Sequence, residues 1–216
     1  MTSMPAKPAL QPLPMPIPTA GVSASTKRRA VEFFLMVIPA GMLLVSLLLP
    51  YWGITLHAPQ YPKGLRIEAF AYQLSGDVSE VDGLNHYIGM MKLDTAAVFE
   101  RQIALFAIPL IALVTVVSLG LRGVWRTLAR LPIIIFPVVF VADLFAWLYY
   151  AGHNLDPHAA LSSSIKPFTP HIVGVGMIGQ FSTEAMFMSG FWLAAIAALL
   201  VLAATIWQWR TGDAAR

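Results

Sequence analysis

Four runs of apolar residues, each long enough to cross a bilayer as a helix, constrain this chain more than any other feature. They cover residues 31–50, 103–121, 131–150 and 190–207. A hydrocarbon core about 30 Å thick needs about 20 residues of helix. Of the 216 residues only 12% are charged, against roughly 25% in an ordinary soluble domain. The sequence therefore predicts an integral membrane protein with four transmembrane helices.

The distribution of charge predicts the orientation of these helices. The segments before the first run, between the second and third, and after the fourth hold most of the basic residues: Lys7, Lys27, Arg28, Arg29, Arg122, Arg126, Arg130, Arg210 and Arg216. The two longer loops, 51–102 and 151–189, hold more acidic than basic residues. By the positive-inside rule both termini are expected in the cytoplasm, with the chain in the cytoplasmic (inner) membrane. The net charge of +3 is thus an orientation signal, and no nucleic-acid partner is expected.

The chain divides into a tail, a membrane domain and a second short tail. Residues 1–30 are rich in proline and read as a disordered cytoplasmic tail. Residues 31–208 form the membrane domain, and residues 209–216 a cytoplasmic tail. In the first outer loop, alternation over residues 65–72 predicts a strand, and "SGD" predicts a turn before a second short extended piece. These two pieces are expected to form a small extracytoplasmic β-hairpin. The second outer loop is expected to pack on the first.

A weak internal repeat suggests how the helices are arranged. A shift of 90 residues brings "YIGMMKLDTAAVF" (87–99) onto "MIGQFSTEAMFMS" (177–189), each followed by an apolar run. The fold class expected is an all-α membrane protein whose four helices form two related helical hairpins. The glycines of "VGVGMIGQF" suggest that the backbone there passes close to another element.

The outer loops hold all five histidines and half of the ten methionines, and the chain has no cysteine. Imidazole and thioether side chains are ligands for a soft ion such as Cu(I). His86 and Met90 would share one face of a helix at i, i+4, or one side of a strand. The candidate metal ligands are His86, Met90, Met91, Met177 and His171.

Other interpretations of the same residues stay open. The methionines also suit packing at the membrane surface, and His86 also suits a hydrogen bond to a backbone carbonyl. His57 and His153, just past two helix ends, are a weaker candidate pair for a haem. Asp143 lies well inside a span, where an ionisable side chain needs a partner, and Arg101 is one candidate. Catalytic motifs are missing, so an enzyme is not expected.

Several outer-loop segments resemble a known group of proteins. They are "YPKGL" (61–65), "GDVSEVDGLNHYIGM" (76–90), "KPFTP" (166–170) and "IGQF" (178–181). They are similar to those of small polytopic membrane proteins whose genes are associated with nitrous oxide reductase maturation clusters and other copper-enzyme contexts. The resemblance covers residues 31–208 and carries over Asn85, His86, Gly89 and Met90. It implies an accessory role in copper supply, in maturation or in electron delivery.

The leading expectation is a membrane accessory protein that presents an extracytoplasmic His/Met site for Cu(I) handling or for assembly of a copper-dependent enzyme. One alternative is a metal-free scaffolding subunit whose outer loops dock another protein. A second alternative is a haem- or quinone-linked electron-transfer subunit that uses His57 and His153.

Overall fold

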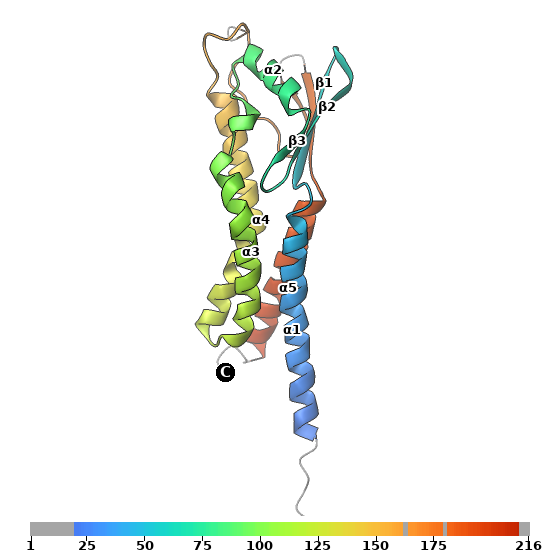
Figure 1. Cartoon of the computed structure of the whole chain (residues 1–216), viewed down its shortest axis with the longest axis vertical. Coiled ribbons are helices and arrows are strands. Elements are labelled where there is room, and N and C mark those ends of the chain that lie inside the picture. The colour runs from blue at the N-terminus through green and yellow to red at the C-terminus, as the bar shows by residue number, and fades with distance from the viewer. Residues whose placement is uncertain (1–19, 162–163, 179–180, 212–216) are drawn as a thin grey trace, which may run out of the picture.

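The computed structural model describes residues 20–161, 164–178 and 181–211. Four long helices stand side by side, and a small antiparallel sheet sits on one end of the bundle (Figure 1). The helices are α1 (Ala20–Ser46), α3 (Val98–Val117), α4 (Val124–His153) and α5 (Ser189–Arg210). All four are long and apolar enough to cross a membrane. The expectation of a multi-pass membrane protein is confirmed to this extent.

The helices pack in a closed arrangement around one apolar core. α1 contacts α3 and α5, and α4 contacts the same two helices. Met36, Leu43, Ile108, Ile133 and Val201 lie at the centre. α5 is the most buried span, and four of its nine buried residues are alanine. Small side chains let helix backbones approach closely in a bilayer, where van der Waals packing replaces the hydrophobic effect between helices.

Two helix boundaries differ from the sequence prediction. α1 begins at Ala20, inside the segment expected to be a disordered tail, and ends at Ser46 rather than near residue 50. The rest of that tail, residues 1–19, lies outside the described residues, as do residues 212–216 of the second tail. α4 begins at Val124 rather than 131. Arg126 and Arg130 therefore belong to the helix and not to a loop, which gives them partners inside the bundle.

The prediction of a mostly helical protein with a small extramembrane β-structure is confirmed, but the outer loops build a five-stranded sheet and not a single β-hairpin. Its strands are β1 (Trp52–Ala58), β2 (Tyr61–Ala69), β3 (Leu74–Gly76), β4 (Gly174–Ile178) and β5 (Phe181–Phe187). Their order is β3-β2-β1-β5-β4, with every pair antiparallel. The second outer loop packs on the first, as expected, because β5 pairs with β1 from Trp52↔Phe187 to His57↔Ser182.

The segment after "SGD" is also different from the prediction. Instead of an extended piece it forms the helix α2 (Val78–Ile88), and the 3₁₀ turn η1 (Leu93–Thr95) follows. Val81 and Leu84 of α2 cover Leu65 and Ile67 of β2. The 90-residue shift therefore superposes the end of α2 and the start of α3 on the hairpin β4–β5, which have different secondary structures.

The sheet is joined to the bundle at Tyr51, which is fully buried. Its N–H donates to the carbonyl of Ala69 at 2.8 Å, and its carbonyl accepts from the N–H of Met188 at 2.9 Å. Ser46 donates to the carbonyl of Leu43 at 2.6 Å, so the Tyr51 hydroxyl is the donor in its 2.6 Å bond to Ser46. Burial raises the pKa of Tyr51 to about 12. The side chain thus stays a neutral hydrogen-bond donor.

The opposite end of the bundle is joined by Arg130 of α4, whose side chain is 0% exposed. Its guanidinium donates to Ser118 at 3.0 Å, to Gln208 of α5 at 2.6 Å and to Glu32 of α1 at 3.4 Å. Gln208 also donates to Glu32 at 2.9 Å. One buried cation therefore connects α1, the end of α3, α4 and α5.

We expect Arg130→Met to destabilise the bundle by about 3 kcal/mol, since removing one member of a buried ionic network leaves the other polar groups without partners. The matched control is Arg210→Met, an exposed arginine at the same end of the bundle. Surface substitutions of this kind usually change stability by less than about 0.5 kcal/mol. Thermal unfolding in detergent measures both. Equal melting temperatures for the two variants would show that the network adds no stability.

Candidate functional site

The segment "LNHYIGMM" covers the end of α2 and the residues just after it. The helix stops at Gly89, whose φ of 81° lies in the left-handed region. The N–H groups of Gly89 and Met90 both donate to the carbonyl of Asn85. Met90 and Met91 are half-buried beyond the helix, while His86 is exposed on its last turn. His86 and Met90 therefore do not share a helical face, because the helix ends between them.

The same segment is held against the second outer loop. The N–H of Asp156 donates to the carbonyl of Gly89 at 2.8 Å, and that of Leu161 donates to the carbonyl of Tyr87 at 2.9 Å. A Cβ atom on Gly89 would lie 2.7 Å from the Asp156 carbonyl oxygen. The motif thus has a structural role, because its backbone ties the two outer loops together.

The loop side of this contact carries a charged turn. The Asp156 carboxylate accepts from the backbone N–H of His158 at 2.8 Å. That hydrogen bond is the main cause of the lowered pKa of Asp156, and charge on the His158 and His86 rings lowers the pKa further. The hydrogen bond from Asp156 to Gly89 places this turn beside the end of α2, three residues after His86.

Met177 and His171 lie on opposite faces of the sheet. Paired residues of an antiparallel sheet point to the same face, and the face alternates along each strand. Gly176 is paired with Thr183, and a Cβ atom on Gly176 would strike the His171 ring. His171 thus covers the inner face, on which α2 also packs. Met177, the next residue along β4, points outward and is 67% exposed.

The five predicted ligands therefore do not form one coordination shell. His86, Met90 and Met91 lie at the end of α2, His171 on the inner face of β4, and Met177 on the outer face. Within residues 20–161, 164–178 and 181–211, no group of three or more His, Cys, Asp or Glu side chains could hold a metal ion. The expectation that glycines in "VGVGMI" mark a close approach is confirmed at Gly176.

The remaining histidines have neighbours of their own. His57 lies on the outer face of β1, beside Gly64. His153 stacks on Tyr149, with ring centroids 4.0 Å apart, and its Nδ1 lies 2.9 Å from the Tyr149 carbonyl oxygen. Nothing in this placement favours a shared haem. Asp143 and Arg101 do not form the ion pair considered above, and Arg101 donates instead to the carbonyl of Asp94 at 2.7 Å.

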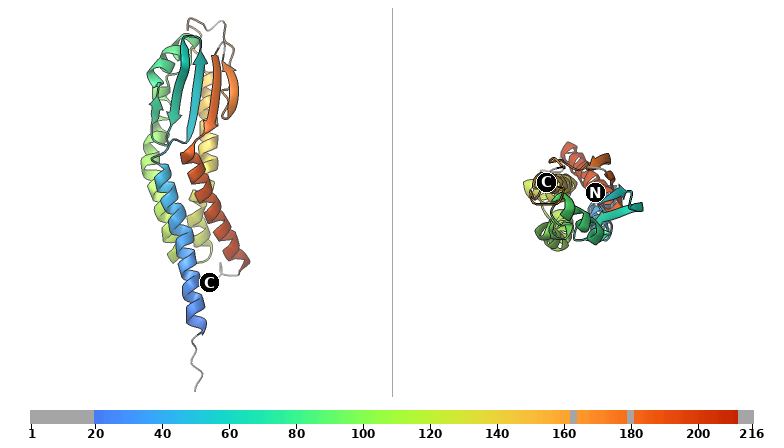
Figure 2. Two further views of the ribbon diagram at one scale, coloured as in Figure 1. Left: turned by 90° about the vertical axis from the view of Figure 1, so that its right-hand side faces the viewer. Right: turned by 90° about the horizontal axis from the view of Figure 1, so that it is seen from above.

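Strand β4 presents an open edge on the extramembrane part of the molecule (Figure 2). Its sequence, "GVGMI", has no charged residue and no proline. Val175 is 70% exposed, and Val173, Met177 and Met186 around it are also exposed. This segment was expected in a loop, although its alternation of glycine with larger apolar residues is typical of a strand with one open face.

Two comparisons with known proteins give no relative. No protein-family model matches the chain, and no curated protein matches it. The resemblance to proteins of copper-enzyme gene clusters therefore stays a hypothesis based on the quoted segments.

Gly89→Ala is expected to loosen the second outer loop. An alanine would have to adopt a left-handed conformation, which costs roughly 1–2 kcal/mol, and its Cβ would approach the Asp156 backbone. The control is Gly83→Ala in the middle of α2, where a Cβ meets nothing within 4 Å and helix propensity improves by up to about 1 kcal/mol. Amide hydrogen exchange of Asp156 and Leu161 should accelerate in the first variant only. Unchanged exchange in Gly89→Ala would contradict the tie between the loops.

Proposed function

We propose that the protein is a membrane-anchored docking subunit that binds another protein through the β4 edge. The observation that carries the proposal is the open, uncharged edge strand Gly174–Ile178 outside the spans, with Val175 and Met177 70% and 67% exposed. This is the metal-free scaffolding alternative of the sequence analysis.

The unprotected character of this edge supports binding. Natural sheets block their edges with lysine, proline, bulges or very short strands, since open edges pair with other chains. The opposite edge follows that rule, because β3 has three residues and leads directly into α2. β4 has no such device, and exposed apolar side chains flank it. Addition of a strand to such an edge is a common mode of peptide recognition.

The occupant proposed is an extended apolar segment of a different protein. A second copy in the same membrane would be related by a twofold axis along the bilayer normal. The strands run close to the long axis of the molecule (Figure 2), so this axis would bring two β4 strands together in parallel with N–H facing N–H. Parallel strands need a stagger of one residue to form hydrogen bonds, which that symmetry forbids.

A photo-crosslinking amino acid at Val175 tests this proposal in native membranes. We expect one discrete adduct at Val175 and none at Ser75, which lies on the opposite edge strand. A Met177→Lys substitution should remove the adduct, because a charge on an edge strand opposes pairing. Equal labelling at both edges, or an adduct with a second copy of this chain, would contradict the docking function.

We also propose how the bundle is oriented in the membrane and from which helical units it is built. The basic segments at the end opposite the sheet support a cytoplasmic location of both termini and an inner-membrane location by the positive-inside rule. The sheet would then face outward. Packing of α1 on α3 and of α4 on α5 supports two helical hairpins as building units, although the differing elements under the 90-residue shift give no support to their relatedness.

Cu(I) handling is a second candidate, and it is restricted to the end of α2. His86 is exposed there, Met90 and Met91 follow within five residues, and Asp156 lies nearby. His171 and Met177 do not fit this site. The chemistry that supports the candidate is the preference of Cu(I) for imidazole and thioether ligands.

Anaerobic Cu(I) titration against a competing chelator tests this candidate. If the site exists, the full-length protein binds about one equivalent, and His86→Ala/Met90→Ala loses it, because Cu(I) held by few ligands depends on each of them. The matched control is His57→Ala/Met186→Ala on the outer face of the sheet, which should retain the metal. Equal binding by all three proteins would exclude a site at the end of α2.

A further inference from the structure

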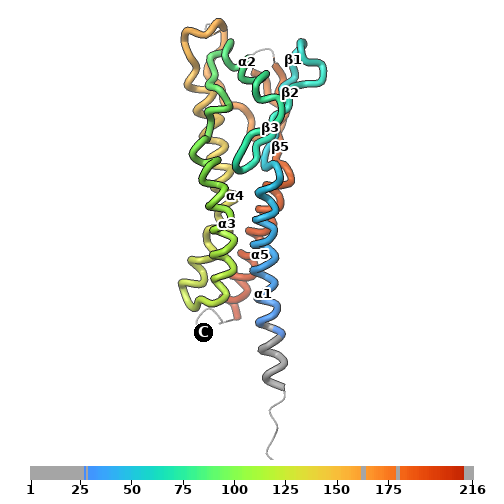
Figure 3. The backbone as a smooth tube through the Cα atoms, viewed as in Figure 1, coloured from blue at the N-terminus to red at the C-terminus, as the bar shows by residue number. Residues whose placement is uncertain are grey.

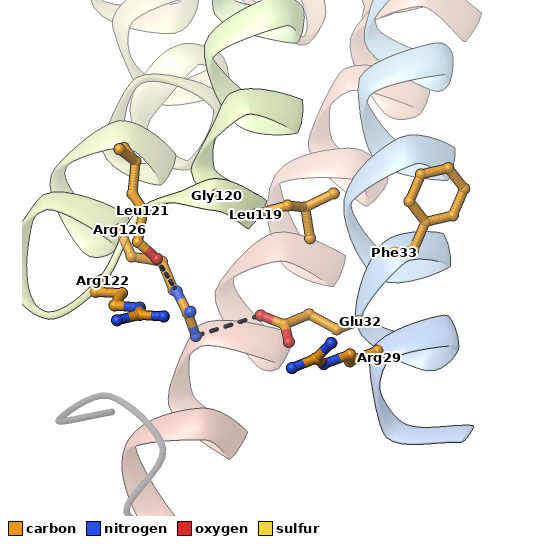
Figure 4. Close-up of a pocket in the computed structure, with 8 residues that line it drawn as sticks. All are labelled: Arg29, Glu32, Phe33, Leu119, Gly120, Leu121, Arg122 and Arg126. Carbon is orange, nitrogen blue, oxygen red and sulfur yellow. Dashed lines mark hydrogen bonds and ion pairs between the residues drawn. The ribbon is translucent and has the colours of Figure 1, made fainter. Parts of the chain in front are cut away.

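The end of the bundle opposite the sheet contains a cavity of about 500 Å³. It lies between α1, the 3₁₀ turn η2 (Ser118–Gly120) after α3, and the first turn of α4 (Figure 4). Arg29 begins the first membrane span and Gly120 ends the second. The cavity therefore lies at one boundary of the hydrocarbon region, where lipid headgroups are located.

The cavity has an excess of positive charge. Arg29, Arg122 and Arg126 line it together with one acid, Glu32. A single oxygen of Glu32 contacts the buried Arg130 and Arg126, each at 3.4 Å, and Gln208 at 2.9 Å. Arg130 already offsets the charge of Glu32. Neither Arg29 nor Arg122 forms an ion pair with any residue that the structure describes, so three cationic side chains surround the opening.

Arg126 is held in position by two interactions, one with a backbone carbonyl and one with the Glu32 carboxylate. Its Nε donates to the carbonyl of Leu121 at 2.9 Å, and Nη1 faces Glu32, while neither interaction uses Nη2. The α4 N-terminus adds partial positive charge, and its N-cap residue, Gly123, has no side chain that could accept from the first helix N–H groups. The guanidinium is thus oriented before any ligand arrives.

Part of the cavity wall is apolar. Phe33 and Leu119 line it, and Phe33 is 49% exposed. A ligand that combines an anionic phosphate with hydrocarbon would match both the arginines and this wall. Arginine recognises phosphate oxygens with paired hydrogen bonds, and basic pockets between transmembrane helices bind anionic lipid headgroups.

We propose that this cavity binds the phosphate group of an anionic phospholipid through Arg29, Arg122 and Arg126. The site is independent of the β4 edge, since it lies at the other end of the molecule (Figure 3). Its ligand would order the junction between α1, η2 and α4, beside the Arg130 network.

Native mass spectrometry of the full-length protein in detergent, with phosphatidylglycerol or phosphatidylcholine added, tests the site. We expect one phosphatidylglycerol to be retained, with an affinity at least about tenfold above that for phosphatidylcholine. Both lipids carry a phosphate, but the choline cation of phosphatidylcholine offsets that charge and would be repelled by the three arginines, whereas phosphatidylglycerol has a net negative charge. Arg29→Gln/Arg122→Gln should lose the preference. Lys27→Gln/Arg210→Gln removes the same charge at the same end but outside the cavity, and should keep it.

The other outcomes overturn the proposal. An equal loss of the phosphatidylglycerol preference in both double variants would mean that the lipid is attracted to a basic surface in general. Displacement of the lipid by millimolar inorganic phosphate would mean that a soluble phosphate compound, and not a lipid, is the ligand. If Arg29→Gln/Arg122→Gln does not fold, the single variant Arg122→Gln, at an exposed position, is measured instead. It should lower the preference for phosphatidylglycerol, and an unchanged preference would refute the site.

Discussion

The passage of the chain from bilayer to water at Tyr51 is the constraint on which the rest of the outer structure depends. Backbone groups that leave a transmembrane helix need new partners at once. Tyr51 bonds through its backbone to Ala69 and Met188, and Pro50 accepts from Gly190 at 2.8 Å. A Cβ on Gly190 would strike Leu49 and the Tyr51 ring. This contact fixes α1 against α5, so β1 and β5 emerge side by side in pairing register.

Because β1 and β5 continue directly from the two central helices, the sheet is an extension of the bundle and not a separate domain. The other strands add outward from this pair, and only one face needs covering. α2 covers it over β1 and β2, and the segment around His171 covers it over β5 and β4. Within the part of the chain that the structure describes, no further strand pairs with the β4 edge, and Met177 and Met186 on the outer face are exposed.

The four spans could be predicted from the sequence, because a membrane span requires only a sufficient length of apolar residues, and both properties are local. The sequence predicted a hairpin in place of the five-stranded sheet, since the pairing of Trp52 with Phe187 joins residues far apart in the chain, and no local pattern contains that information. It assigned Arg130 to a loop because an arginine usually marks the end of a span. The network with Ser118, Gln208 and Glu32 is what allows the helix to start earlier and bury that charge.

The clustering of histidine in the outer loops was a compositional signal, and composition does not bring side chains together. Histidine is excluded from apolar spans, so its presence outside them says little about whether two rings face one site. His171 precedes β4 and its ring lies against Gly176 on the inner face, whereas Met177 points to the outer face, although only five residues lie between them. The αL turn at Gly89 separates His86 from Met90. By contrast, the strand edge and the arginine cavity are defined by the positions of several elements at once. For this reason the strand edge and the arginine cavity support functional proposals better than the histidine and methionine content of the outer loops does.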